Sequence, residues 1–195
     1  TILGMGLCGV ANYGADVGGF HGPCPDRELF VRWVQNGIFM PRFSIHSSNS
    51  DNTVTQPWMF SDAISLITDV IRLRYSLLPY FYSLMYQASD QGTPILRPLF
   101  YDFQNDLNAY DNDTQFMFGP SILVANILEP GVSVLDVYLP NGCEWHDFYT
   151  RKRYLGGQEI TIDVTLDSIP MFVRSDAVVP MTRGISNIQK DPMTH

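Results

Sequence analysis

Basic residues are scarce in this sequence: 12 Lys and Arg stand against 20 Asp and Glu, and the formal net charge of the 195 residues is −8. Nucleic-acid binding needs a basic face, and the one basic cluster, Arg151 to Arg153, is short and typical of a solvated turn. Long apolar runs are also missing, since none reaches the roughly 20 residues that span a bilayer. We therefore expect a soluble protein with neither nucleic acid nor a membrane as its partner.

Cysteine and histidine are scarce too. The three cysteines (Cys8, Cys24 and Cys143) and the four histidines have none of the spacings typical of metal sites. The odd number of cysteines predicts buried free thiols rather than a disulfide framework. The glycines between residues 14 and 19 lack the G-x-G-x-x-G spacing of a nucleotide-binding loop. The sequence therefore predicts neither a metal nor an organic cofactor.

The most informative segment lies in the first quarter of the chain. An apolar run, residues 10–15, ends on Asp16; a helical pattern covers about Asp26 to Asn36; and a second apolar run, residues 38–43, leads to His46. Strand, loop, helix and strand in this order predict a βα unit of a parallel sheet. Because polar residues at the C-terminal ends of strands carry the chemistry of βα barrels, Asp16 and His46 are predicted to line two neighbouring walls of an active site.

The remainder divides into a helical and a strand-rich part. From Ser61 to about Gln91 apolar residues recur three or four apart, and Pro79 inside this pattern is expected to kink or split the helix. After Gly92 short apolar runs alternate with turn residues, which predicts an antiparallel sandwich. The runs cover residues 121–127, 133–139, 159–164 and 171–173. The aromatic residues expected in the core between the two parts are Trp33, Tyr75, Tyr80, Phe81, Tyr82 and Tyr86.

The segment GADVGGF at residues 14–20, the helical stretch after it and a His that follows a Phe-x-Pro run resemble glycoside hydrolase family 31, which includes α-glucosidases and α-xylosidases. The resemblance continues in five further blocks: residues 73–80, 94–100, 115–120, 137–140 and 169–174. It implies the C-terminal part of a (β/α)8 TIM barrel (residues 1–92, the last two βα units), then an antiparallel β-sandwich domain (residues 93–180) and the start of a distal β domain (residues 181–195). Because a complete barrel takes roughly 250 residues, we interpret the chain as a fragment of a larger enzyme.

Enzymes of this family use two Asp carboxylates, a nucleophile and an acid/base, in the retaining arrangement, in which the groups lie about 5 Å apart. The resemblance places both upstream of Thr1. We therefore expect no catalytic residue in this chain, no turnover by the isolated chain, and the remainder of the parent polypeptide as its partner. By the same resemblance, His46, Phe20 and Asp16 bind substrate in or beside the −1 sugar pocket. Arg42, where the hydrolases usually carry an apolar residue, is expected to contact substrate or to pair with a carboxylate.

The residues around His46 depart from the hydrolases of the family. Those commonly have Arg-Asn-His-Asn where this chain has Ser44-Ile45-His46-Ser47. The segments 21–27 and 39–49 are more similar to the α-1,4-glucan lyases of algae and fungi, which cleave starch-type chains by elimination to 1,5-anhydrofructose. The lyase and the hydrolase share a covalent glycosyl intermediate. If Ser44 and Ile45 exclude water from the site, the intermediate is directed towards elimination and away from hydrolysis.

Three hypotheses follow. The first is a fragment of an α-1,4-glucan lyase that acts from the non-reducing end of starch, glycogen or maltooligosaccharides. The second is a fragment of a retaining α-glucosidase, and the third is a non-catalytic carbohydrate-binding module. In each, the expected ligand is an α-glucan or a maltooligosaccharide. A parent gene that encodes both upstream Asp motifs would exclude the third hypothesis, and product analysis separates the first two.

Overall fold

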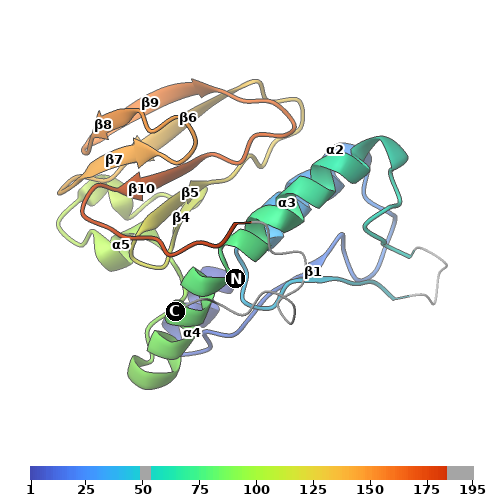
Figure 1. Cartoon of the computed structure of the whole chain (residues 1–195), viewed down its shortest axis with the longest axis horizontal. Helices are drawn as coiled ribbons and strands as arrows, with labels where there is room; N and C mark the ends of the chain where they lie inside the picture. Colours follow the sequence, from blue (N-terminus) through green and yellow to red (C-terminus); the bar gives the residue numbers. More distant parts are fainter. Residues whose placement is uncertain (49–53, 184–195) are drawn as a thin grey trace.

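The computed structural model describes residues 1–48 and 54–183. Figure 1 shows helices with a short strand pair at one end of the molecule and a group of antiparallel strands at the other. Among these residues, no helix combines the length and the apolar character that a membrane crossing requires. Asn49, in the predicted lyase-like segment, and residues 184–195, most of the predicted distal domain, lie outside the described residues.

The N-terminal part is built around one parallel strand pair. Helix α1 (Ile2–Leu7) precedes β1 (Asp16–Val17), helix α2 (Arg27–Gly37) follows it, and β2 (Ser44–Ile45) completes the pair. Asp16 lies opposite Ser44, and Val17 lies opposite Ile45. The predicted βα unit is therefore confirmed, although each strand begins just after the apolar run predicted to form it. The sequence did not predict α1.

Helix α2 begins where its capping residue predicts. Asp26 Oδ1 accepts a hydrogen bond from the backbone N–H of Leu29 at 2.9 Å, which satisfies one of the free donors of the first turn. Glu28 lies in that turn, where the helix dipole favours negative charge. Phe30 and Val34 on the opposite face are fully buried, so the helix packs an apolar face behind the strand pair.

The long helical pattern forms two helices. A short 3-10 turn, η1 (Ser61–Ala63), leads into α3 (Ile64–Ser76), and α4 (Leu78–Gln91) follows after the fully buried Leu77. Pro79 lies in the first turn of α4, where its missing N–H has no intrahelical partner to lose. The predicted split at this proline is confirmed. Gly92 ends α4 with φ of 70°, a backbone conformation that glycine adopts without strain.

Two expectations about side-chain burial are wrong in part. Tyr80 and Phe81 lie in the core, but Tyr82 and Tyr86 are 71% and 66% exposed, since they project from the opposite side of α4. The three cysteines are free, as expected, yet Cys8 and Cys24 are exposed and only Cys143 is partly buried. Both sequence expectations used residue type, whereas burial depends on which side of an element the residue occupies.

The strand-rich part contains one large sheet and one separate strand pair. The sheet has the order β3-β4-β5-β10-β7-β8, every neighbour is antiparallel, and β6 pairs with β9. The antiparallel arrangement predicted for this part is confirmed. The elements are β3 (Leu96–Arg97), α5 (Leu99–Asp102), η2 (Leu107–Ala109), β4 (Gln115–Phe118), β5 (Ile122–Ala125), β6 (Val134–Leu139), β7 (Glu144–Asp147), β8 (Arg153–Leu155), β9 (Gln158–Asp163) and β10 (Met171–Arg174).

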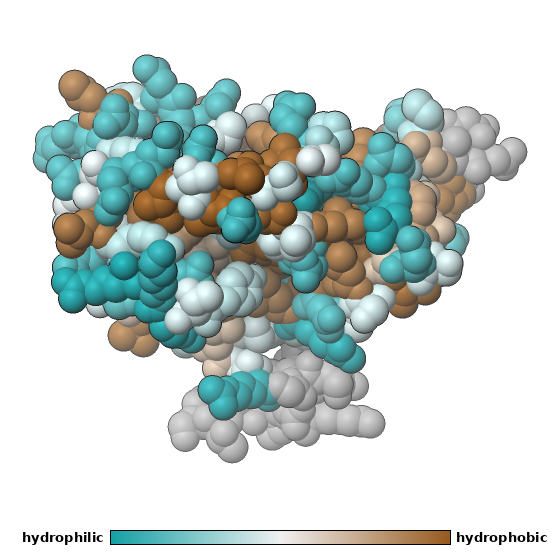
Figure 2. Space-filling view, turned by 90° about the horizontal axis from the view of Figure 1, so that it is seen from above, coloured by the Kyte–Doolittle hydropathy of each residue, from teal (hydrophilic) through white to brown (hydrophobic). Residues whose placement is uncertain are grey.

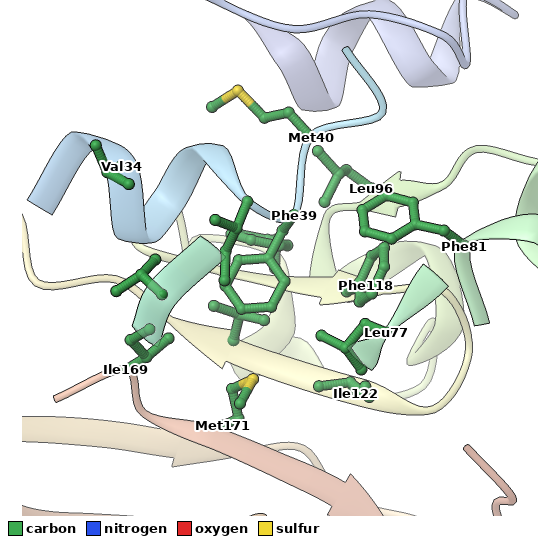
Figure 3. Close-up of a cluster of buried hydrophobic side chains, with 14 of the residues drawn as sticks. Val34, Phe39, Met40, Leu77, Phe81, Leu96, Phe118, Ile122, Ile169 and Met171 are labelled. Atoms are coloured by element: carbon green, nitrogen blue, oxygen red, sulfur yellow. The ribbon is translucent and has the colours of Figure 1, made fainter. Parts of the chain in front are cut away.

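One apolar core joins the helices to the large sheet (Figure 3). The ring of Phe118 in β4 lies 5.6 Å from that of Phe39, just after α2, and 4.6 Å from that of Phe81 in α4. Tyr80 adds a polar contact in the same region: its hydroxyl donates to the Phe118 carbonyl and accepts from the Ser121 N–H, each at 3.1 Å. Burial raises the pKa of Tyr80. In Figure 2, apolar residues form a band between the strand-rich end and the helices.

A second core lies inside the strand-rich part. Val137 and Leu139 of β6 are fully buried in one cluster with Trp145 and Phe172 of the large sheet. The Trp145 indole N–H donates to the Pro140 carbonyl at 2.9 Å, so this large ring is buried with its polar atom satisfied. The strand pair thus covers one face of the sheet.

Gly14 allows the chain before β1 to approach the chain before β2. A Cβ at this position would lie 1.8 Å from the carbonyl oxygen of Arg42. The backbone N–H of Arg42 also donates to the Tyr13 carbonyl at 3.4 Å. Only a residue without a side chain fits between these two stretches of backbone.

We predict that Gly14→Ala lowers the melting temperature of the full-length protein, because the neighbour that must move is backbone. Overpacking of this kind costs about 1–3 kcal/mol. Gly4→Ala in α1 is the matched control, since a Cβ there meets no atom within 4 Å and alanine favours a helix. Thermal unfolding followed by circular dichroism measures both variants. An unchanged melting temperature for Gly14→Ala would contradict the close approach.

Candidate functional site

The candidate site lies along the strand pair β1 and β2 and the loops that follow it. Asp16 opens β1, and Arg42 lies two residues before β2. Arg42 Nη2 donates to Asp16 Oδ1 at 2.7 Å, with the Asp16 side chain 27% exposed and that of Arg42 46% exposed. Arg42 was expected either to contact substrate or to pair with a carboxylate, and in the structure it pairs with the carboxylate of Asp16.

Phe20 and His46 meet in front of these strands. Phe20 follows the turn after β1, is 41% exposed, and its ring centroid lies 5.4 Å from that of His46. The His21 ring also contacts Phe20, edge-on, with the two ring centroids 4.5 Å apart. The backbone N–H of Ser48 donates to the Phe20 carbonyl at 2.7 Å, which ties the loop after β2 to the loop after β1. The structure thus brings together two of the predicted site residues as a ring pair.

Strand alternation assigns the residues of β2 to two faces. Successive side chains of a strand point to opposite faces, so Arg42, Ser44 and His46 share one face, and Asp16, opposite Ser44, belongs to the same face. Val17 is fully buried on the other face, where Phe43 and Ile45 pack against the core.

This alternation corrects one sequence expectation. Ile45 belongs to the core face, packed against buried residues, so it does not dry the site as the lyase hypothesis requires. Ser44 is the one member of that pair on the site face. The error arose because neighbouring residues in a strand were treated as lining the same pocket.

The turn after β1 depends on two glycines. Gly18 and Gly19 have φ of 93° and 87°, which glycine alone adopts without a steric cost, and the N–H of Gly19 donates to the Asp16 carbonyl at 3.0 Å. Thr55 covers the turn, since a Cβ at Gly18 would lie 2.3 Å from its methyl group. The Thr55 N–H donates to Ser47 Oγ at 2.9 Å. Sequence reasoning missed this support, because no local pattern shows that residues 55 and 18 meet.

The arrangement holds groups that can pack on a ligand and form hydrogen bonds with it. It offers an aromatic ring, an imidazole and an ion-paired carboxylate on one face. A retaining glycosidase needs two carboxylates about 5 Å apart, and among the described contacts of this site Asp16 is the only carboxylate. In the described part of the chain, no group of three or more His, Cys, Asp or Glu could hold a metal ion.

Comparisons with known proteins agree on one family. The model described as "Glycosyl hydrolases family 31 TIM-barrel domain" matches residues 1–84, and the "Glycosyl hydrolase family 31 C-terminal domain" matches residues 92–179. A probable glucan 1,3-alpha-glucosidase of Oryza sativa subsp. japonica is 40% identical over 99% of this chain. An alpha-xylosidase of Saccharolobus solfataricus is 39% identical over 96% of it. The chain spans 21% and 26% of these two relatives.

Solved structures agree in fold. The Flavobacterium johnsoniae dextranase complexed with isomaltotriose superposes with a TM-score of 0.87 at 35% identity, over 92% of this chain and 22% of that one. An alpha-xylosidase from a soil metagenome, complexed with xylose, gives a TM-score of 0.82 at 35% identity, over 91% and 29%. The predicted fold class, the C-terminal part of a TIM barrel followed by an antiparallel β domain, is confirmed. The chain belongs to glycoside hydrolase family 31.

Proposed function

We propose that the protein to which this chain belongs is a retaining glycoside hydrolase that cleaves α-glucosidic bonds in α-glucans or maltooligosaccharides. The observation that carries this proposal is the presence of two contacts around one parallel strand pair: the ion pair of Asp16 with Arg42 and the ring pair of Phe20 with His46. The named relatives support the hydrolytic reaction, since they are glucosidases and a xylosidase. The similar dextranase was crystallised with isomaltotriose and with glucose, which supports a glucose-containing ligand.

Each residue of this face has a role that suits its chemistry. The Phe20 ring supplies an apolar wall for a pyranose, and the imidazole of His46 beside it donates a hydrogen bond to a sugar hydroxyl. Asp16 accepts from a hydroxyl with the oxygen that Arg42 leaves free, while the ion pair fixes its orientation. The nucleophile and the acid/base belong to the remainder of the polypeptide. This chain then contributes one wall of the −1 subsite.

The α-1,4-glucan lyase remains a second candidate on one observation. Ser44 lies on the site face, where the hydrolases of the family commonly carry Arg. Ser44 lies within the second lyase-like segment, residues 39–49, but none of the relatives named above is a lyase, and Ile45 packs against the core. Hydrolysis is therefore the better supported outcome. A non-catalytic carbohydrate-binding module is the least supported, because the compared relatives are enzymes.

Product analysis in H2(18)O tests the reaction. A hydrolase places a water oxygen on the anomeric carbon, so the glucose released from maltotetraose by the full-length enzyme is expected to carry the label. A lyase breaks the C2–H bond and releases 1,5-anhydrofructose, which contains one water less than glucose. Mass spectrometry of the products separates the two. Anhydrofructose as the main product would replace the hydrolase by the lyase, and the absence of any product from a folded full-length protein would favour the binding module.

His46→Ala is expected to lower kcat of the full-length enzyme about a hundredfold, because a hydrogen bond that strengthens as the sugar flattens contributes mainly to the transition state. KM is expected to change far less. His146→Ala is the matched control, since His146 lies in β7 of the strand-rich part. Steady-state kinetics on maltooligosaccharides, with thermal melts, measure both. A kcat within about threefold of the parent, together with a lower melting temperature, would make His46 a structural residue.

A further inference from the structure

The segment that leads into β2 is held by a partly buried arginine. The Arg74 guanidinium in α3 donates through Nη1 to the carbonyls of Ile38 and Met40, at 2.5 and 2.8 Å, and through Nη2 to that of Pro41 at 3.0 Å. Its Cζ lies 4.5 Å from the centroid of the Phe81 ring. One side chain therefore binds three carbonyls within four consecutive residues.

Arg74 has these contacts in place of a carboxylate partner. None of the ion pairs among the described residues includes it. Desolvation lowers the pKa of Arg74 to about 10, so the guanidinium stays charged at neutral pH. A second ring, Phe43, lies 5.3 Å from its Cζ. Carbonyl dipoles and ring faces thus compensate a partly buried charge that otherwise costs free energy.

The segment has little regular structure of its own. Residues 38–43 belong to no helix or strand. The N–H groups of residues 38–40 bond back to the end of α2, through Ile38 to Val34 (3.1 Å), Phe39 to Asn36 (3.3 Å) and Met40 to Gly37 (2.9 Å). The bond from the Arg42 N–H to the Tyr13 carbonyl is long, at 3.4 Å. Arg74 therefore supplies the short, charge-assisted bonds that fix the path of the chain. The residue after the last of the three carbonyls is Arg42.

We propose that Arg74 is a positioning residue for the sugar site. By fixing the carbonyls of Ile38, Met40 and Pro41, it sets the direction in which the chain enters β2, and so places Arg42 against Asp16 and His46 beside Phe20. The proposal rests on the proposed function, since it assigns Arg74 a role in that same site. Through Arg74, helix α3 then affects the activity although it contributes no residue to the site face.

The geometry needs an arginine. Three carbonyls are bound through two nitrogens of one planar group whose face also packs on Phe81. A lysine carries the same charge, but its ammonium is compact and cannot stack on a ring in this way. Arg74→Lys therefore keeps the charge and removes the fixed geometry.

The test uses the full-length enzyme and the variant Arg74→Lys. We expect kcat to fall about tenfold or more with a smaller change in KM, because small displacements of binding groups cost rate. Arg72→Lys is the matched control on the same helix, since Arg72 is exposed and pairs with Asp69 at 2.9 Å, and its kcat is expected to stay at the parent value. Tyr80→Phe controls for stability, because it removes two buried hydrogen bonds of the shared core, to Phe118 and Ser121, and leaves the hydrogen bonds of Arg74 in place.

A double-mutant cycle with His46→Ala identifies the route of the effect. If Arg74 acts through His46, Arg74→Lys is expected to have little further effect on kcat once His46 is Ala, whereas independent effects multiply. Full multiplicativity would overturn the proposal. So would a kcat for Arg74→Lys within twofold of the parent, or an equal loss of kcat in Tyr80→Phe at equal folded fraction.

The failures of the two proposals are distinguishable. Anhydrofructose as the main product, or no product at all, rejects the proposed function, and an unchanged kcat in His46→Ala rejects the role of His46 in it. A normal His46→Ala effect with an unchanged Arg74→Lys rejects only the positioning role. If Arg74→Lys does not fold, Phe81→Leu removes the ring under the guanidinium together with its contact with Phe118, and Tyr80→Phe remains the control for lost core stability. Phe81→Leu is then expected to lower kcat in the same direction by a smaller factor, and a parental kcat in a folded Phe81→Leu enzyme would overturn the proposal.

Discussion

The parallel pairing of β1 with β2 is the interaction on which the rest of the site depends. It aligns Asp16 with Ser44 and thereby assigns each neighbouring side chain either to the site or to the core. Two residues in each strand supply few hydrogen bonds, so the pair is stabilised from behind by α2 and at its entry by the close approach that Gly14 permits. The precision of the site is therefore set by packing and by Arg74 more than by the strands themselves.

The strand-rich part takes a share in that packing. Arg32 Nη2 donates to the Thr165 carbonyl at 3.0 Å, and Gln35, almost fully buried, donates to the Leu166 carbonyl at 2.7 Å. Both residues belong to α2, which connects the two site strands. On the apolar side, Phe118 lies between Phe39 and Phe81 (Figure 3). A perturbation of the β domain at this seam therefore reaches the site through α2, although no strand of the large sheet contributes a residue to the site face.

Sequence patterns predicted the features that depend on local chemistry. The start of a helix at about Asp26, the split at Pro79 and the end of the helical pattern at Gly92 each follow from residue types and their neighbours, and all three are found. The contacts between distant segments were not predictable. A side chain at Gly14 would collide with the backbone of Arg42, and Thr55 packs on Gly18. No periodicity in the sequence indicates either contact. The assignment of Ser44 and Ile45 to the site or to the core was not predictable either. It depends on the register of β2, and the sequence does not show where this strand starts.

In the proposed function, the same alternation limits how this wall can influence the reaction. A change at Ile45 alters core packing and reaches the sugar only through the position of the strand, whereas a change at Ser44 alters the surface that the sugar contacts. Arg42 and His46 lie on either side of Ser44 on that face. The wall therefore has a polar side chain at each end and a small one in the middle. Space for water beside the sugar is then set by Ser44 and by groups from the remainder of the polypeptide. The choice between attack by water and loss of a proton therefore belongs to the assembled pocket, and this chain supplies the rigid wall against which that choice is made.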